Sequence, residues 1–139
     1  LIEEYVRTGE ANIILRHFPL GPKPITEGAI AAEAAGMQAR QWQSAEPFMR
    51  NLELAPEQGV TKGFLNEVAA VVPKLDVTQW EEDVESGEAE ELAAADEEQA
   101  ALQTFPAAPT VVVTGAGGTE VLEEAPTLEE IEAAIAAVA

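Results

Sequence analysis

Apolar residues recur at helical spacing from the first residues of the chain onward. One helical face of the opening stretch is apolar, and it carries Leu1, Ile2, Tyr5 and Val6. Gly9 is expected to end this helix. Because no capping residue precedes Leu1, we interpret the stretch as the second half of a helix that begins upstream.

A short apolar run follows, "NIILRHF" at residues 12–18, with Ile13, Ile14 and Leu15 at its centre. A run of this length, rich in β-branched residues, predicts a buried strand. The proline-punctuated "PLGPKP" after it predicts a loop.

Residues 25 to 103 predict an almost wholly helical segment. The alanine-rich stretch from 25 to about 51 predicts two helical pieces, with a break at Pro47 or in the region 41–45. The next helix is closed by Pro73. Its predicted inner face carries Phe64, Leu65, Val68, Val71 and Val72.

Capping residues mark the following two helices. Asp76, with Gln79 three residues later, predicts a capping box. The inner stripe of that helix carries Val77, Trp80 and Val84. Ser86 can cap a further helix that runs to about Gln103.

The remaining residues change to a β pattern and then return to helix. Residues 109–114 predict a strand, "GAGG" a turn and "TEVLEE" a second strand, so the two must form an antiparallel hairpin. Thr127 and Glu130 predict a capping box for the last helix. The predicted inner face of this helix carries Leu128, Ile131, Ile135 and Val138.

The charge balance restricts the classes of partner. There are 26 acidic and 7 basic residues, which gives a net charge of −19. Such a charge repels nucleic-acid phosphates and anionic lipid surfaces. The acids form no calcium-binding loop and fall on predicted helix faces, so we expect a solvated surface, with no metal and no cofactor. The sequence contains no cysteine, and therefore no thiol chemistry can come from these residues.

Individual side chains give few further signals. His17 is the only histidine, has no cysteine or serine partner in a recognisable motif, and is interpreted as structural, with Arg16 and His17 facing either the helical segment or solvent. Several large apolar residues at helical spacing are expected to pack mostly in the core. These are Trp42, Phe48, Met49, Phe64 and Trp80.

Four segments, in this order and spacing, resemble the DsbA-like branch of the thioredoxin fold. "IEEYVRTGEANIILRHFPL" resembles the end of the family's active-site helix and the next strand, and "AIAAEAAGMQARQWQSAEPFMRNL" the start of its inserted helical domain. "FPAAPTVVVTG" resembles its cis-proline loop and following strand, and "TLEEIEAAIAAV" its last helix. The resemblance implies an α/β thioredoxin-like fold with a helical insertion, lacking the N-terminal strand and the first half-helix. The thioredoxin-like portion would comprise 1–20 and 104–139, and the insertion 21–103.

The resemblance also implies a reaction and a site. The family exchanges thiols and disulfides through a Cys-x-x-Cys pair at a helix N-terminus, which would lie upstream of Leu1 here. Ala108 would offer its backbone to an extended peptide or protein substrate, and Pro109 would face the cysteine pair. About 5–6% of X–Pro bonds in folded proteins are cis. The residues alone therefore favour a trans strand-entry proline, whereas the resemblance implies a cis bond.

The missing segment has a structural consequence. In thioredoxin-like folds, the strand before the active-site helix lies between the strands that match 12–17 and 109–114. We therefore expect the intact protein to contain an upstream strand, and we do not expect 12–17 to pair directly with 109–114. Because disulfide-forming chemistry belongs in oxidising compartments, the resemblance implies an extracytoplasmic location.

Three functional hypotheses stay open from the sequence. The first is a thiol–disulfide oxidoreductase whose redox cysteines lie outside this chain. The second is a non-catalytic relative, which keeps the fold as a peptide-binding or interaction module. The third is an acidic structural subunit whose partner completes the sheet. The sequence does not fix the redox direction, the substrates or the oligomeric state.

Overall fold

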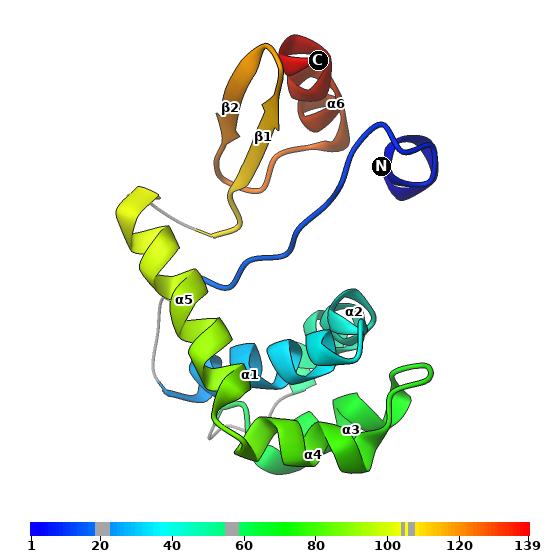
Figure 1. Cartoon of the computed structure of the whole chain (residues 1–139), viewed down its shortest axis with the longest axis vertical. Helices are drawn as coiled ribbons and strands as arrows, with labels where there is room; N and C mark the ends of the chain where they lie inside the picture. Colours follow the sequence, from blue (N-terminus) through cyan, green and yellow to red (C-terminus); the bar gives the residue numbers. More distant parts are fainter. Residues whose placement is uncertain (19–22, 55–58, 104, 106–107) are drawn as a thin grey trace. The chain divides into compact units, whose positions relative to one another are not determined.

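The computed structural model describes residues 1–18, 23–54, 59–103, 105 and 108–139 (Figure 1). The chain divides into two compact units, which are described separately below. The terminal unit contains Leu1–Ile14 and Gln103–Ala139, and the helical unit contains Leu15–Leu102. The chain thus enters the helical unit at residue 15, earlier than the boundary at residue 21 that the resemblance implied.

The helical unit consists of helices joined by short connections (Figure 1). Its elements are α1 (Lys23–Met37), α2 (Gln41–Asn51), the 3₁₀ turn η2 (Leu52–Leu54), α3 (Lys62–Val71), α4 (Val77–Glu85) and α5 (Glu88–Gln103). Thr61 caps α3 by accepting a hydrogen bond from the backbone N–H of Phe64. The predicted helical character of residues 25–103 is confirmed for the described residues.

Small and large side chains alternate in the core of the helical unit. Ala34 and Ala35 of α1 are fully buried, which lets neighbouring helices approach α1 closely. Phe64 is buried, and its ring meets that of Phe48 edge to face, with the ring centroids 5.7 Å apart. Trp80 is 4% exposed in this core. The core positions predicted for α3 and α4 are therefore confirmed, except that Val71 is 63% exposed.

The break between α1 and α2 lies elsewhere than expected. It falls between the two helices at Gln38–Arg40, where Ala39 has a φ of 56°, whereas Pro47 lies inside α2. The side chain of Gln38 holds this turn through two hydrogen bonds to the backbone of Asp76, which is distant in sequence. The Nε2 of Gln38 donates to the carbonyl of Asp76 at 3.0 Å, and its Oε1 accepts from the N–H of Asp76 at 2.9 Å. The sequence prediction was wrong because this long-range contact has no local signal.

The same contact changes the predicted capping box at Asp76. The Asp76 carboxylate accepts from the N–H of Gln79 at 3.1 Å, as predicted. The reciprocal bond is absent, because Gln38 already occupies the N–H of Asp76 and the Gln79 side chain donates to Asp83 instead. Asp76 is therefore an N-cap without the full box.

The terminal unit holds a hairpin, a helix and one π-helical turn (Figure 1). Its elements are η1 (Ile2–Val6), β1 (Val111–Gly115), β2 (Gly118–Leu122) and α6 (Leu128–Val138). The strands pair antiparallel from Val111 with Leu122 to Gly115 with Gly118, and this confirms the predicted hairpin. Gly9 has a φ of 80° after η1, a conformation that suits glycine at a helix end.

Helix α6 packs against both strands of the hairpin. The hairpin turn touches the helix end directly, since the N–H of Gly117 donates to the carbonyl of Val138 at 2.8 Å. A Cβ on Gly115 would overlap that same carbonyl. The predicted capping box of α6 is confirmed, because Glu130 N–H donates to Thr127 Oγ1 at 3.3 Å and Thr127 N–H donates to Glu130 Oε2 at 2.7 Å. Of the predicted inner face, Val138 is buried, but Leu128 is 53% exposed.

The buried strand expected at 12–18 is not formed. Residues 11–18 carry no regular secondary structure, and Ile13 and Ile14 are 38% and 69% exposed. A strand requires a ladder partner, and no residue in the described parts of the chain pairs with this segment. Residues 12–17 are therefore not laddered to 109–114, in keeping with the expectation about direct pairing.

Candidate functional site

The loop before β1 presents Ala108 and Pro109 at the surface. Both residues are exposed, and the peptide bond between them is cis. The carbonyl of Pro109 is already occupied, because it accepts from the N–H of Ala125 at 3.3 Å. This bond ties the loop to the segment between β2 and α6.

Ala108 differs from its neighbour in its hydrogen bonding. Within the described residues, neither its N–H nor its C=O makes a hydrogen bond. An exposed backbone with a free donor and acceptor can pair with an extended peptide, as a strand edge does. The two site residues expected from the resemblance are thus adjacent and accessible. The sequence contains no cysteine that they could face.

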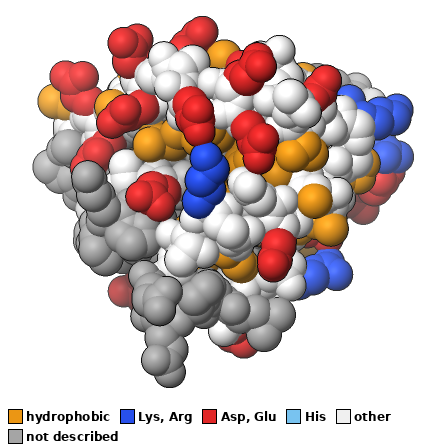
Figure 2. All heavy atoms as spheres, turned by 90° about the horizontal axis from the view of Figure 1, so that it is seen from below, with side chains coloured by type: hydrophobic (Ala, Val, Ile, Leu, Met, Phe, Trp, Pro, Cys, Tyr) orange, Lys and Arg blue, Asp and Glu red, His pale blue; other side chains and the backbone are white. Residues whose placement is uncertain are grey.

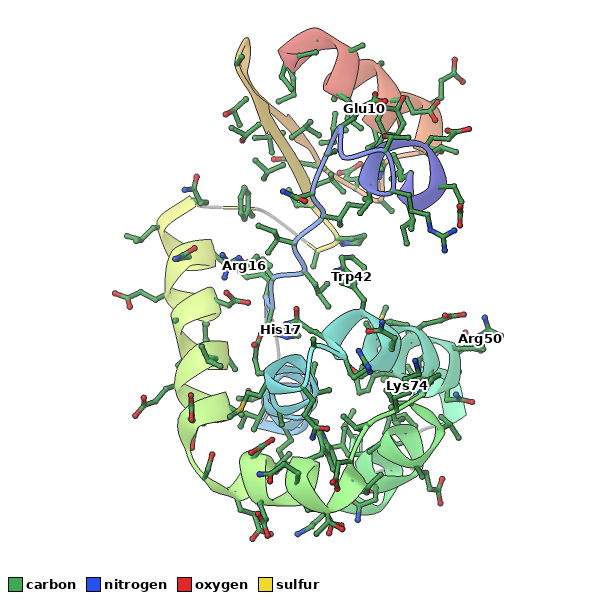
Figure 3. The ribbon with its side chains drawn as sticks, turned by 45° about the vertical axis from the view of Figure 1, so that its right-hand side comes forward. Glu10, Arg16, His17, Trp42, Arg50 and Lys74 are labelled. Carbon is green, nitrogen blue, oxygen red and sulfur yellow. The ribbon has the colours of Figure 1, made fainter. Side chains whose placement is uncertain are left out.

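A second group of polar side chains lies in the helical unit, where the chain enters it. Asp96 of α5 is 4% exposed, and its carboxylate accepts two hydrogen bonds from the entering segment. Arg16 Nη1 donates to Oδ1 at 2.7 Å, and the backbone N–H of His17 donates to Oδ2 at 2.9 Å. Figure 3 shows Arg16 and His17 on this segment. The segment is thereby fastened to α5.

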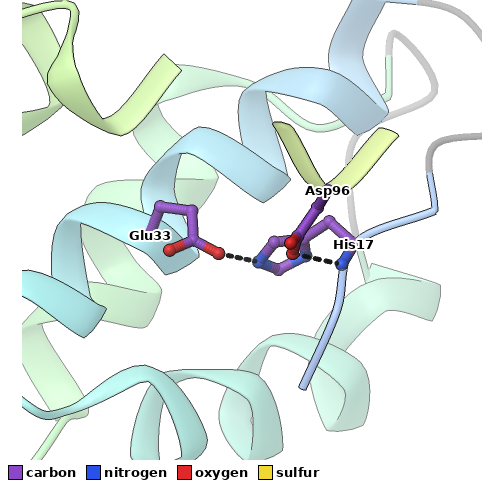
Figure 4. A group of neighbouring side chains, drawn as sticks. All are labelled: His17, Glu33 and Asp96. Atoms are coloured by element: carbon purple, nitrogen blue, oxygen red, sulfur yellow. Dashed lines mark hydrogen bonds and ion pairs between the residues drawn. The ribbon is translucent and has the colours of Figure 1, made fainter. Parts of the chain in front are cut away.

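Glu33 of α1 meets the His17 ring from the other side (Figure 4). Its Oε1 lies 3.1 Å from His17 Nε2 and also accepts from Gln41 Nε2 at 2.7 Å. The His17 contact is not an aligned hydrogen bond, because Nε2 is buried and has no hydrogen-bond partner among the described residues. Burial raises the pKa of Glu33 above its ordinary value, although the nearby His17 opposes the shift.

His17, Glu33 and Asp96 together resemble a ligand set for a cation. One ligand atom from each lies within 4.8 Å of the others, and all three side chains are buried or half-buried. The sequence expectation of a structural histidine facing the helical segment fits its position. The two acidic partners were missed, because 16 and 79 positions separate them from His17 and no local motif links the three.

The large apolar residues divide between core and surface. Phe64 and Trp80 are buried and Phe48 is half-buried, as expected for core positions. Trp42 and Met49 are 45% and 66% exposed. Both lie on α2, and Figure 3 labels Trp42 near its start. On the face shown in Figure 2, acidic side chains are dispersed among apolar and uncharged ones.

A profile of the thioredoxin family, described as Thioredoxin, matches residues 1–137. The chain belongs to this family. It therefore has the thioredoxin-family fold, with a mixed α/β composition. No described helix is long and apolar enough to cross a membrane.

Two curated relatives have the same printed name, probable disulfide bond formation protein D, and come from Bacillus cereus and Bacillus anthracis. Each is 30% identical to this chain over 118 residues, which is 83% of the chain and 55% or 54% of the relative. The chain spans about half the length of these relatives. No solved structure matches it significantly.

Proposed function

We propose that this chain is the substrate-facing and helical part of a thiol–disulfide oxidoreductase, whose redox cysteines lie outside the present sequence. The observation that carries the proposal is the family match over residues 1–137, together with the similarity to two relatives named for disulfide bond formation. The exposed loop at Ala108 and Pro109 supports it. The segment at Ile13 and Ile14 has no strand partner among the residues that the structure describes, and an additional strand would add to the fold there.

The chemistry needs two cysteines at the N-terminus of a helix upstream of Leu1. There, orphan N–H groups and the helix dipole lower the pKa of the first thiol and favour the thiolate. In the oxidising direction, a substrate thiolate attacks the disulfide of the pair and forms a mixed disulfide, and one cysteine leaves as a thiolate. A second substrate thiolate then attacks the mixed disulfide. The substrate becomes oxidised and the pair becomes reduced by two electrons.

The contribution of this chain is to hold the substrate during that exchange. The N–H and C=O of Ala108 pair with the backbone of an extended peptide, which places a substrate sulfur beside Pro109. Pro109 has no N–H and presents only an apolar ring there. The methyl group of Ala108 is small, so peptides with varied side chains can be accommodated.

The substrates would be peptide or protein thiols and disulfides, and the exchange requires no cofactor. The net charge of −19 disfavours nucleic acid as a partner. Because stable disulfides form in oxidising compartments, we place the protein outside the cytoplasm. The helical unit, Leu15–Leu102, would correspond to the inserted domain that the resemblance assigns to residues 21–103.

A trapped intermediate tests the role of Ala108. In the whole encoded protein, the second cysteine of the pair is replaced by serine, and a mixed disulfide is formed with a cysteine-containing peptide. We expect the Ala108 amide proton to exchange at least tenfold more slowly in the mixed disulfide, with no change at the exposed amide of Glu124. A mixed disulfide that leaves the Ala108 amide unprotected would refute the role of Ala108.

The absence of cysteine from all 139 residues favours a second candidate, a peptide-binding module without redox activity. The two hypotheses differ in what the whole encoded protein contains. If the residues upstream of Leu1 hold a strand and helix without a Cys-x-x-Cys pair, the binding module is favoured. Peptide binding would then be measurable without any change in the redox state of the peptide.

A further inference from the structure

We propose that His17, Glu33 and Asp96 bind one divalent cation of the class that accepts both imidazole nitrogen and carboxylate oxygen, Zn²⁺ foremost. The three residues come from the entering segment, from α1 and from α5 of the helical unit (Figure 4). None belongs to the loop at Ala108 and Pro109. The proposal is therefore independent of the thiol–disulfide reaction.

The spacing of the ligand atoms suits a small cation. One nitrogen and two oxygens lie within 4.8 Å of one another. Zn²⁺ binds such atoms at about 2.0–2.2 Å in tetrahedral geometry, so its ligand atoms lie roughly 3.4 Å apart. His17 Nε2 and Glu33 Oε1 are already 3.1 Å apart, and small rotations of the carboxylate side chains would bring the remaining ligand atoms to this spacing.

His17 Nε2 is the atom that most directly indicates a missing ligand. It is buried and has no hydrogen-bond partner among the described residues. Buried polar side-chain atoms are nearly always satisfied, and each exception requires an explanation. A neutral imidazole nitrogen with a free lone pair is the commonest protein ligand for Zn²⁺.

The charges at the site also favour a cation. The side chains of Asp96 and Glu33 are only 4% and 12% exposed. Apart from His17 itself, Arg16 is the one basic side chain recorded in contact with either acid in the described parts of the chain, and it is 60% exposed. A buried divalent cation would offset both carboxylates.

Neighbouring donors already orient the ligands. Gln41 Nε2 holds Glu33 Oε1 at 2.7 Å, while Arg16 and the His17 N–H hold the two oxygens of Asp96. Each carboxylate oxygen has a second lone pair, so these hydrogen bonds do not exclude coordination. Such outer contacts commonly fix metal-ligating carboxylates and imidazoles.

The expected role of the ion is to stabilise the helical unit. It would join the entering segment to α1 and α5, three segments that are far apart in the sequence. A ligand that binds only the folded state raises the free energy of unfolding according to its concentration and affinity. All three side-chain ligands belong to the helical unit, Leu15–Leu102, and none belongs to the loop assigned to substrate binding.

Metal titration of the untagged chain, first dialysed against a chelator, tests the site. We expect one Zn²⁺ per chain by calorimetry and a rise in the melting temperature with Zn²⁺. His17→Ala and Glu33→Gln are each expected to weaken Zn²⁺ binding tenfold or more. Glu85→Gln removes an equal charge from an exposed acid that pairs with Lys62, and it should leave the affinity unchanged.

Three results would each overturn the proposal. The first is Zn²⁺ binding that His17→Ala leaves unchanged. The second is Ca²⁺ binding that is as tight as Zn²⁺ binding and does not need His17. The third is the absence of any Zn²⁺-dependent shift of the imidazole ¹⁵N signals in the unaltered chain. Because the chain has one histidine, those signals belong to His17 alone and do not depend on a folded variant.

Discussion

The indole Nε1–H of Trp80 donates a 2.8 Å hydrogen bond to the backbone carbonyl of Ala31. This bond joins α4 to α1 in the core of the helical unit, where both residues are buried. Ala31 lies inside α1, so its carbonyl accepts this bond from Trp80 while it is also part of the helix backbone. Trp80 therefore contributes both packing and a polar contact to the same interface.

Because Trp80 makes both contacts, its replacement by phenylalanine should lower the free energy of unfolding. Trp80→Phe removes the N–H donor and leaves a small void, and we expect the free energy of unfolding to fall by about 1–3 kcal/mol. Chemical denaturation followed by circular dichroism measures the change. Trp42→Phe is the matched control at a 45% exposed position, where we expect a change within about 0.5 kcal/mol. Equal effects at the two positions would contradict the structure.

Asp96 should contribute more to the free energy of unfolding than its exposed acidic neighbours on α5. Asp96→Asn keeps the shape but removes the charge that Arg16 and the His17 N–H contact. We expect a loss of about 1.5–3 kcal/mol in unfolding free energy, because the affected hydrogen bonds involve a buried charged group. Glu97→Gln, at the next and exposed position, should be nearly neutral. Similar denaturation midpoints for the two variants would show that Asp96 does not hold the segment.

Replacement of two glycines by alanine should change the stability in opposite directions. Gly115→Ala places a Cβ against the carbonyl of Val138, so the hairpin or α6 must shift and the terminal unit should lose about 1–3 kcal/mol. Gly63→Ala lies near the start of α3, where the added Cβ would meet Thr61 Oγ1 at an ordinary contact distance of 3.9 Å, and a gain of roughly 0.5 kcal/mol is expected. Thermal melts of both variants provide the comparison. A neutral Gly115→Ala would exclude the close approach.

The α6 cap should make stability depend on acid pH. Hydrogen bonds from Thr127 hold the pKa of the Glu130 carboxyl below its ordinary value. The bond from the backbone N–H contributes most, and the bond from the hydroxyl contributes less. A carboxyl with a lowered folded-state pKa stabilises the fold above its unfolded pKa and loses that contribution as pH falls through the folded value. The wild type should exceed Glu130→Gln in stability at pH 7. The difference should shrink as the pH falls below the ordinary glutamate pKa of about 4.3, and it should be lost below the lowered folded-state pKa. A difference that persists at lower pH, or that Glu129→Gln reproduces, would contradict this assignment.

Local signals predicted much of the secondary structure. The hairpin followed from the strand pattern on either side of "GAGG", and the α6 cap followed from Thr127 and Glu130, because each depends on residues close in sequence. The turn at Ala39 was placed wrongly, because it depends on the distant contact between Gln38 and Asp76. Local patterning does not encode such contacts.

Tertiary context also explains the other differences. The pattern of residues 12–18 suits a strand, but strand formation needs a partner, and the described residues supply none. His17, Glu33 and Asp96 are brought together only when the entering segment, α1 and α5 are packed. In contrast, Ala108 and Pro109 are adjacent in sequence and were selected from the family resemblance alone, so their role in substrate binding stays a prediction.

Turnover by the whole encoded protein tests the central proposal most directly. The measurement is the rate of thiol–disulfide exchange with a dithiol peptide or with insulin, compared with a variant in which both cysteines of the pair are serine. We predict catalysed exchange by the unaltered protein and none by the variant. A folded whole protein that has both cysteines and still catalyses no exchange in either direction would contradict the proposal.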